Sequence, residues 1–151
     1  MLAEEFLGRL VLPWQIVVAR LAGAAILCGV IGLEREWRAH PAGLRTHMTV
    51  GVAAATFALI TLSLIEMFRD QSDVIRLDPI RLVEASTAGV AFLAAGMIVL
   101  SRGEVKNLTT GAGMWLAAGI GLACGLGFWP IAALASFLGF LIIGVLGRIT
   151  D

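Results

Sequence analysis

The side chains best suited to chemistry are concentrated in residues 34–47, which read E-R-E-W-R-A-H-P-A-G-L-R-T-H. Five charged side chains and both histidines of the chain fall in this segment, between two long apolar runs. Carboxylates could supply the oxygen ligands that Mg²⁺ takes, and arginines could hold an anion. The candidate residues of this segment are Glu34, Arg35, Glu36, Gly43, Arg45, Thr46 and His47.

A specific metal site is not predicted from these residues. Glu34 and Glu36 are two positions apart and therefore point to different faces of a helix. Neighbouring arginines and Lys106 repel a divalent ion, and the histidines lack the paired spacing of a zinc site. We therefore expect no resident cofactor, with Mg²⁺ as the one ion worth testing.

A second polar segment begins a later apolar run and holds Asn107, Leu108, Thr109, Thr110 and Trp115. A helix N-terminus lined with hydroxyl groups beside Arg35 and Arg45 could hold an anion. The alternative is that Thr109 only caps its helix and that the charges form a solvated surface. Motifs of hydrolases, metalloproteases and phosphate-binding loops are absent from the sequence, so we predict a protein that is not an enzyme.

Composition indicates a membrane protein, because 59% of the residues are hydrophobic, 15% are charged and the mean hydropathy is +0.93. The net charge of zero gives no basic field for nucleic acid. A helix needs ~20 apolar residues to cross a bilayer. Five segments meet this length, at 14–33, 46–68, 79–100, 109–127 and 130–147. We predict one all-α transmembrane domain over residues 1–151, a bundle of five helices in the lipid bilayer without β structure.

Local signals refine this bundle. Glu34 and Arg38 are spaced i, i+4 and should pair, Thr46 is placed to cap the second helix, and Asp78 followed by a proline should cap the third.

Lysines and arginines favour one side of the membrane, with Arg35, Arg38, Arg45, Arg102, Lys106 and Arg148 against Arg9, Arg69 and Arg76. The positive-inside rule then places the N-terminus outside and the C-terminus in the cytoplasm.

Three ionisable side chains within the predicted helices lie at roughly comparable depth toward the outer leaflet, namely Arg20, Glu66 and Glu84, and Arg81 stands just inside the third helix. A lone charge in a bilayer costs at least ~2.5 kcal/mol, so such groups usually pair. We expect Arg20 to pair with Glu84, with Glu66 as second choice. The alternative is that Arg20 extends to the interface and that Glu66 already lies there.

Small residues recur every four positions in the fourth helix, at Gly113, Ala117, Gly121 and Gly125. Such stripes let helix backbones approach closely in lipid. This stripe could pack against another helix of the chain or form the face of a homodimer, and the sequence does not choose between the two.

Several of these residues together resemble the MgtC/SapB family of bacterial inner-membrane proteins. The resemblance rests on G-L-E-R-E at 32–36, P-A-G-L-R-T-H at 41–47, Asp78 with Pro79, and V-K-N-L-T-T at 105–110 with Trp115. It implies a five-helix transmembrane domain and a link to growth under magnesium limitation and survival in hosts. It also implies a regulatory role through membrane partners such as ATP synthase, with transport of Mg²⁺ or another ion as the alternative.

Two departures from the family pattern are visible. Members commonly carry a glutamine, a serine and glycines in the third helix where this chain has Ala85, Ala88, Ala91 and Ala94. The chain also stops at Asp151, so we expect no soluble C-terminal domain. Functions that depend on those polar groups or on that domain are not carried over.

Overall fold

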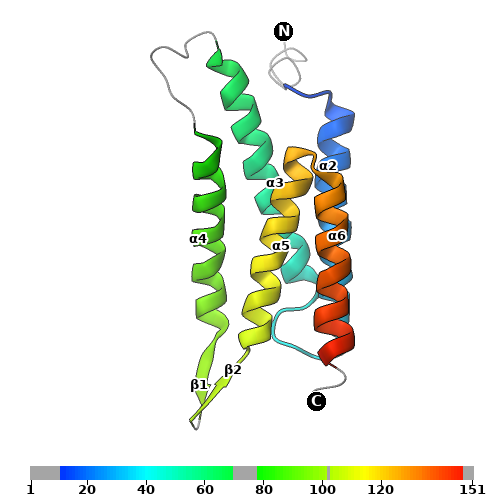
Figure 1. The fold of residues 1–151 in the computed structure, drawn as a ribbon, viewed down its shortest axis with the longest axis vertical. Helices are drawn as coiled ribbons and strands as arrows, with labels where there is room; N and C mark the ends of the chain where they lie inside the picture. The colour runs from blue at the N-terminus through cyan, green and yellow to red at the C-terminus, as the bar shows by residue number, and fades with distance from the viewer. Residues whose placement is uncertain (1–10, 70–77, 102, 148–151) are drawn as a thin grey trace.

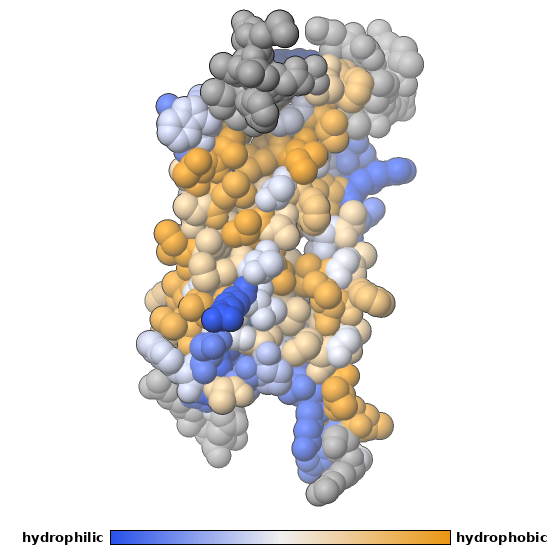
Figure 2. All heavy atoms as spheres, turned by 180° about the vertical axis from the view of Figure 1, so that it is seen from behind, coloured by the Kyte–Doolittle hydropathy of each residue, from blue (hydrophilic) through white to orange (hydrophobic). Residues whose placement is uncertain are grey.

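The computed structural model describes residues 11–69, 78–101 and 103–147. These residues form helices α2 (Trp14–Trp37), α3 (Leu44–Met67), α4 (Pro79–Met97), α5 (Leu108–Leu126) and α6 (Trp129–Phe140), the last continued by a π-helix, η2 (Leu141–Leu146). They form five spans that are long and apolar enough to cross a membrane, as predicted. The helices run alternately up and down, side by side (Figure 1). Figure 2 shows a largely apolar surface with hydrophilic residues gathered mainly toward the ends.

Helix α5 forms the centre of the bundle, whereas α4 lies at its edge. In the most apolar 18-residue stretch of each helix, 67% of α5 is buried but only 11% of α4. The glycines of α5 explain its position, because a Cβ on Gly121 would collide with the backbone of Gly51 and one on Gly125 would lie 2.6 Å from the Ala55 carbonyl oxygen. These positions of the predicted stripe thus pack against α3 within the chain.

A short hairpin joins α4 to α5, so the prediction of no β structure is wrong at this point. Strands β1 (Val99–Ser101) and β2 (Glu104–Lys106) pair antiparallel, and Gly103 turns the chain at φ 83°. Helix α4 therefore ends at Met97 instead of residue 100. The hairpin projects from one end of the bundle (Figure 1), away from the apolar helix faces.

The loop between α2 and α3 is held by a carboxylate. Helix α2 continues to Trp37, beyond the predicted end at 33, and Glu36 Oε2 then accepts a hydrogen bond of 3.0 Å from the Leu44 N–H. Glu36 therefore caps α3, and the predicted cap by Thr46 is wrong, because the helix begins two residues earlier. Gly43 is needed here, since a Cβ would collide with Glu36. At the opposite end of the bundle, Asp78 caps α4 as predicted, through the Ile80 N–H at 2.9 Å.

Candidate functional site: a buried charged cluster

Five polar side chains gather inside the end of the bundle that carries the hairpin. Glu34, Arg35, His47 and Thr110 are 5%, 4%, 0% and 1% exposed, and Arg38 lies beside them. We call these five residues the buried charged cluster. They come from α2, α3 and α5, which converge at this end. Because a buried ion is stable only when it is hydrogen-bonded or paired, the partners of each group define what the site can do.

Arg35 joins α2 to the first turn of α5. Its Nη2 donates a hydrogen bond of 2.6 Å to Thr110 Oγ1, between residues 75 positions apart. A hydrogen bond from a charged donor is among the stronger ones in proteins, and burial strengthens it further. The predicted meeting of the two polar segments at one membrane face is therefore a direct contact.

Glu34 and Arg38 form the predicted i, i+4 pair, with 2.7 Å between Oε1 and Nε. Arg38 Nη2 also lies 3.3 Å from the Gly144 carbonyl oxygen, in the π-helix η2. A π-helix shifts the backbone bonding by one residue, which leaves carbonyl groups available to other donors. Gly144 lets η2 approach, since a Cβ there would lie 3.2 Å from Glu34 Cγ. This pair therefore ties α2 to the last helix.

His47 presents an unpaired nitrogen to the interior. Its Nδ1 lies 2.9 Å from the Gly43 carbonyl oxygen, which can only accept, so Nδ1 carries the hydrogen and Nε2 a lone pair in the neutral ring. Nε2 faces Gly113, where an added Cβ would lie 3.0 Å away. Within the described part of the chain, neither His47 Nε2 nor Glu34 Oε2 has a hydrogen-bond partner. The cluster thus holds two buried acceptors that could take a proton, a water or a cation.

A metal site of ordinary composition is not formed by residues 11–69, 78–101 and 103–147, since no three His, Cys, Asp or Glu side chains come together there. Together with the arginines, this makes a tightly held divalent ion a poor match for the cluster.

The remaining residues of the two predicted segments lie outside the cluster. Arg45, Leu108, Thr109 and Trp115 are exposed, and Thr46 is half-buried. Asn107 adopts a left-handed conformation at φ 64°, and its Nδ2 donates to the Met97 carbonyl at 3.0 Å, which joins the two ends of the hairpin. Of the helix-packing residues, Gly113 makes room for His47, and Ala117 is fully buried with its carbonyl accepting from Cys28.

The predicted pair of Arg20 with Glu84 is wrong. Arg20 Nη1 donates instead to the Gly125 carbonyl at 2.7 Å, at the C-terminal end of α5. A cation there satisfies a free carbonyl and interacts favourably with the helix dipole. Glu84 is exposed on α4, and Glu66 is exposed and lies 3.2 Å from Arg69.

Arg38, a member of the cluster, and Gly144, which packs against it, were missing from the predicted site residues. Arg38 could have been found from its i, i+4 spacing to Glu34, which already indicated the pair. Gly144 has no comparable signal, because its role depends on the π-helix, and no local pattern in L-I-I-G-V-L at 141–146 indicates one.

Comparison with known proteins gives consistent matches. The sequence model of the MgtC family matches residues 21–151. Protein MgtC of Brucella abortus (strain 2308) is 40% identical over 124 residues, which are 82% of this chain and 48% of that protein. The Escherichia coli K12 protein named "Putative magnesium transporter YhiD" is 36% identical over 135 residues, 88% of this chain and 61% of that protein. The chain thus spans about half to three fifths of the length of these relatives. No solved structure matches.

Proposed function

Because this chain belongs to the MgtC family, we propose that it is a non-enzymatic protein of the bacterial inner membrane that supports adaptation to magnesium limitation by contacting other membrane proteins. Its N-terminus would lie outside and its C-terminus in the cytoplasm. The resemblance noted above makes ATP synthase the first partner to test and links the protein to survival in hosts.

The observation that carries this proposal is the outward face of α4. Glu84, Ala88, Ala91 and Ala95 are spaced i, i+4, i+7 and i+11, which places them on one face of the helix, and all four are exposed. Alanines facing lipid leave room for the close approach of another helix. An intramembrane carboxylate at the end of the same stripe favours a partner that pairs with it. We call these four residues the outward stripe.

The buried charged cluster suits the same role as a structural anchor. It ties α2 to α5 through Arg35 and to η2 through Arg38, whereas the described contacts of α4 are mainly with α5. A rigid unit of the other helices would then present α4 to a partner. A contact function requires such a fixed surface and no moving catalytic group.

The proposal is tested by complementation in a bacterium that lacks its own copy and grows poorly in low magnesium. Ala88→Leu with Ala91→Leu should abolish rescue, because two added isobutyl groups block close approach of a helix. Ala19→Leu, a change at another exposed alanine, on α2, is the control and should rescue fully. Rescue by the double variant at normal membrane levels would refute a contact through this stripe.

A second function, ion transport, is favoured by the two unpaired acceptors of the cluster, and the name of the Escherichia coli relative points the same way. Mg²⁺ flux into proteoliposomes carrying the full chain tests it, with empty vesicles and Arg45→Ala, an exposed change outside the cluster, as controls. Flux that depends on the protein and falls in Glu34→Gln would favour transport. Flux equal to that of empty vesicles, from folded protein, would leave the contact function.

A further inference from the structure

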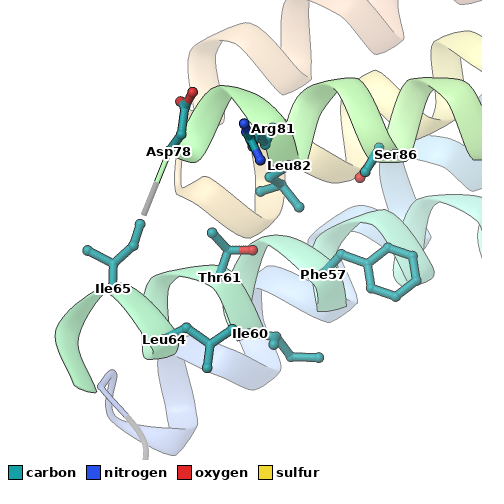
Figure 3. A pocket seen from close by; sticks show the side chains of 10 residues that line it. Phe57, Ile60, Thr61, Leu64, Ile65, Asp78, Arg81, Leu82 and Ser86 are labelled. Carbon is teal, nitrogen blue, oxygen red and sulfur yellow. The ribbon is translucent and has the colours of Figure 1, made fainter. Parts of the chain in front are cut away.

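A long groove runs between α3 and α4, on the side of α4 that faces α3. Its outer part is a hollow of about 620 Å³ lined by Phe57, Ile60, Thr61, Arg81, Ala85 and Ser86, among others. A second hollow of about 320 Å³ continues it deeper and shares Phe57, Ala85 and Ser86 with the first. Figure 3 shows the outer part, with side chains of both helices along it. We call the two hollows together the α3–α4 groove.

The groove is polar at one end and apolar at the other. Asp78 and Arg81 line the outer end, and Val50, Val90 and Leu93 line the deep end. Among the described residues Arg81 makes no hydrogen bond or ion pair, and Asp78 uses only Oδ1, for the cap of α4. A guanidinium and a carboxylate oxygen at the same end of the groove, neither bonded to another described residue, complement a headgroup that carries both a phosphate and an ammonium group.

Ser86 lies between these two ends and lacks a partner. It is 8% exposed, and its hydroxyl makes no hydrogen bond with the described residues, although Thr56, Ser63 and Thr87 each donate to a carbonyl of their own helix. In Figure 3 the Ser86 hydroxyl is directed toward the α3 side of the groove. The hydroxyl lines both hollows, so it is a donor within reach of a ligand acceptor such as an ester carbonyl.

The length of the groove distinguishes a lipid from a helix. Asp78 and Leu93 mark the two ends of the groove on α4 and are fifteen positions apart, which is about 22 Å along the helix axis. One leaflet is about 20–22 Å thick with its headgroup region included, half of the ~40–45 Å of a whole bilayer. A transmembrane helix would need a groove across both leaflets, whereas one acyl chain with its headgroup at Arg81 fills this length.

We infer that the α3–α4 groove binds one phospholipid with an amine headgroup. The phosphate lies at Arg81, the ammonium group at Asp78, an ester carbonyl at Ser86, and an acyl chain extends toward Leu93. The site is on a different side of α4 from the outward stripe and does not depend on the proposed function.

Native mass spectrometry of the full chain tests this. The protein is delipidated in mild detergent and incubated with equal amounts of phosphatidylethanolamine, phosphatidylglycerol and phosphatidylcholine that have the same acyl chains. We expect one bound phosphatidylethanolamine in excess over the other two. Arg81→Gln should raise the dissociation constant for this lipid about tenfold, as expected for the loss of one charge-assisted contact.

Two further variants separate the groove from the surface. Gly89→Leu fills the deep hollow, and no atom lies within 4 Å of an added Cβ there, so the helix accommodates the change. It should lower lipid binding as strongly as Arg81→Gln. Ala133→Leu, exposed on α6, is the matched control and should bind like the wild type.

Three outcomes would overturn the inference. One is equal binding of the three lipids by the wild-type protein, and another is wild-type binding by Gly89→Leu. The third is a dimer of the chain that Gly89→Leu abolishes without changing lipid binding, since a second copy would then occupy the groove.

Discussion

Arg35 carries its positive charge into a site where only 4% of the residue is exposed, and Thr110 is the partner that reaches it from α5. The cost of burying an ion is offset only if its donors find acceptors, so loss of one acceptor is more damaging than loss of a surface bond. Thr110 is 75 positions from Arg35 in the sequence, so this bond joins two helices that only the fold brings together.

We predict that Thr110→Val lowers the free energy of unfolding by about 2 kcal/mol, because it removes the hydroxyl but keeps the shape of the side chain. Thr109→Val is the matched control, since Thr109 is exposed one position earlier, and it should change stability by less than about 0.5 kcal/mol. Thermal unfolding of both variants in the same detergent measures the difference. Equal melting temperatures would show that the Arg35–Thr110 bond contributes little.

Arg20 bonds to a backbone carbonyl group, whereas the prediction gave it a carboxylate side chain as its partner. The sequence contained an acid at comparable predicted depth, and pairing the two ions followed from their cost in lipid. The carbonyl of Gly125 supplied the acceptor instead. Every α-helix has carbonyl groups without a partner at its C-terminal end, whatever its sequence. No pattern of residue types therefore indicates this contact.

The glycines of α5 determine how closely this helix packs against α3. Its two sides differ sharply, since Gly121 touches the backbone of Gly51 whereas Gly119 has no atom within 4 Å of an added Cβ. The helix needs small residues where it meets α3 and tolerates larger ones where it is open.

We predict that Gly121→Ala destabilises the bundle by about 1–3 kcal/mol, because α3 and α5 must separate to admit a methyl group. Gly119→Ala should be neutral or stabilising, since alanine favours the helix over glycine by up to about 1 kcal/mol. Chemical or thermal unfolding in detergent, followed by circular dichroism, distinguishes the two. A similar loss in both variants would mean that helix propensity, and not contact with α3, decides the outcome.

Much of the fold at this scale was predictable, because the bilayer imposes length and hydrophobicity on each helix. Helices α2 to α5, and α6 taken together with η2, were each placed to within about four residues, and the Asp78 cap and the Glu34–Arg38 pair followed from local spacing. Three features were not predicted, namely the cap of α3 by Glu36, the hairpin and the π-helix. Each depends on a contact or backbone shift outside the local sequence pattern.

The candidate site was predictable only in part for the same reason. Glu34, Arg35, His47 and Thr110 were among the predicted residues, yet no property of the sequence separates them from exposed neighbours such as Arg45 and Thr109. Burial follows from how five helices pack, and helix packing is decided by shape over long sequence separations.

At the scale of the whole molecule, both polar connections that flank the cluster lie at one end of the bundle. The α2–α3 loop and the β1–β2 hairpin both lie at that end, and the connection between α5 and α6 lies at the other end (Figure 1). The described cations near the first end are Arg35, Arg38, Arg45 and Lys106. Arg9, Arg76, Arg102 and Arg148, which also entered the predicted charge balance, lie outside the described residues.

We predict that this end faces the cytoplasm. The test uses cells with a permeabilised outer membrane and an intact inner membrane. A maleimide that does not cross the inner membrane should label Ile80→Cys in these cells, and it should label Glu104→Cys only after lysis. Both positions are exposed, at opposite ends of α4 and its hairpin, and neither change alters a lysine or arginine. Cys28 and Cys124 are fully buried and serve as the background control in the unsubstituted chain. The reverse labelling pattern would invert the topology.

The connection between α2 and α3 has a consequence for the order of assembly during synthesis. Its bonds join residues that are four to eight positions apart, from Glu34 to Arg38, from His47 to Gly43 and from Leu44 to Glu36. The first two helices can therefore form a hairpin while the ribosome is still making α4. The bond from Arg35 to Thr110 spans 75 positions and that from Arg38 to Gly144 spans 106, so these two arginines must wait for later helices. Arg35 and Arg38 therefore gain these two partners only after α5 and η2 have been made. A chain truncated before Thr110 would leave Arg35 without this partner.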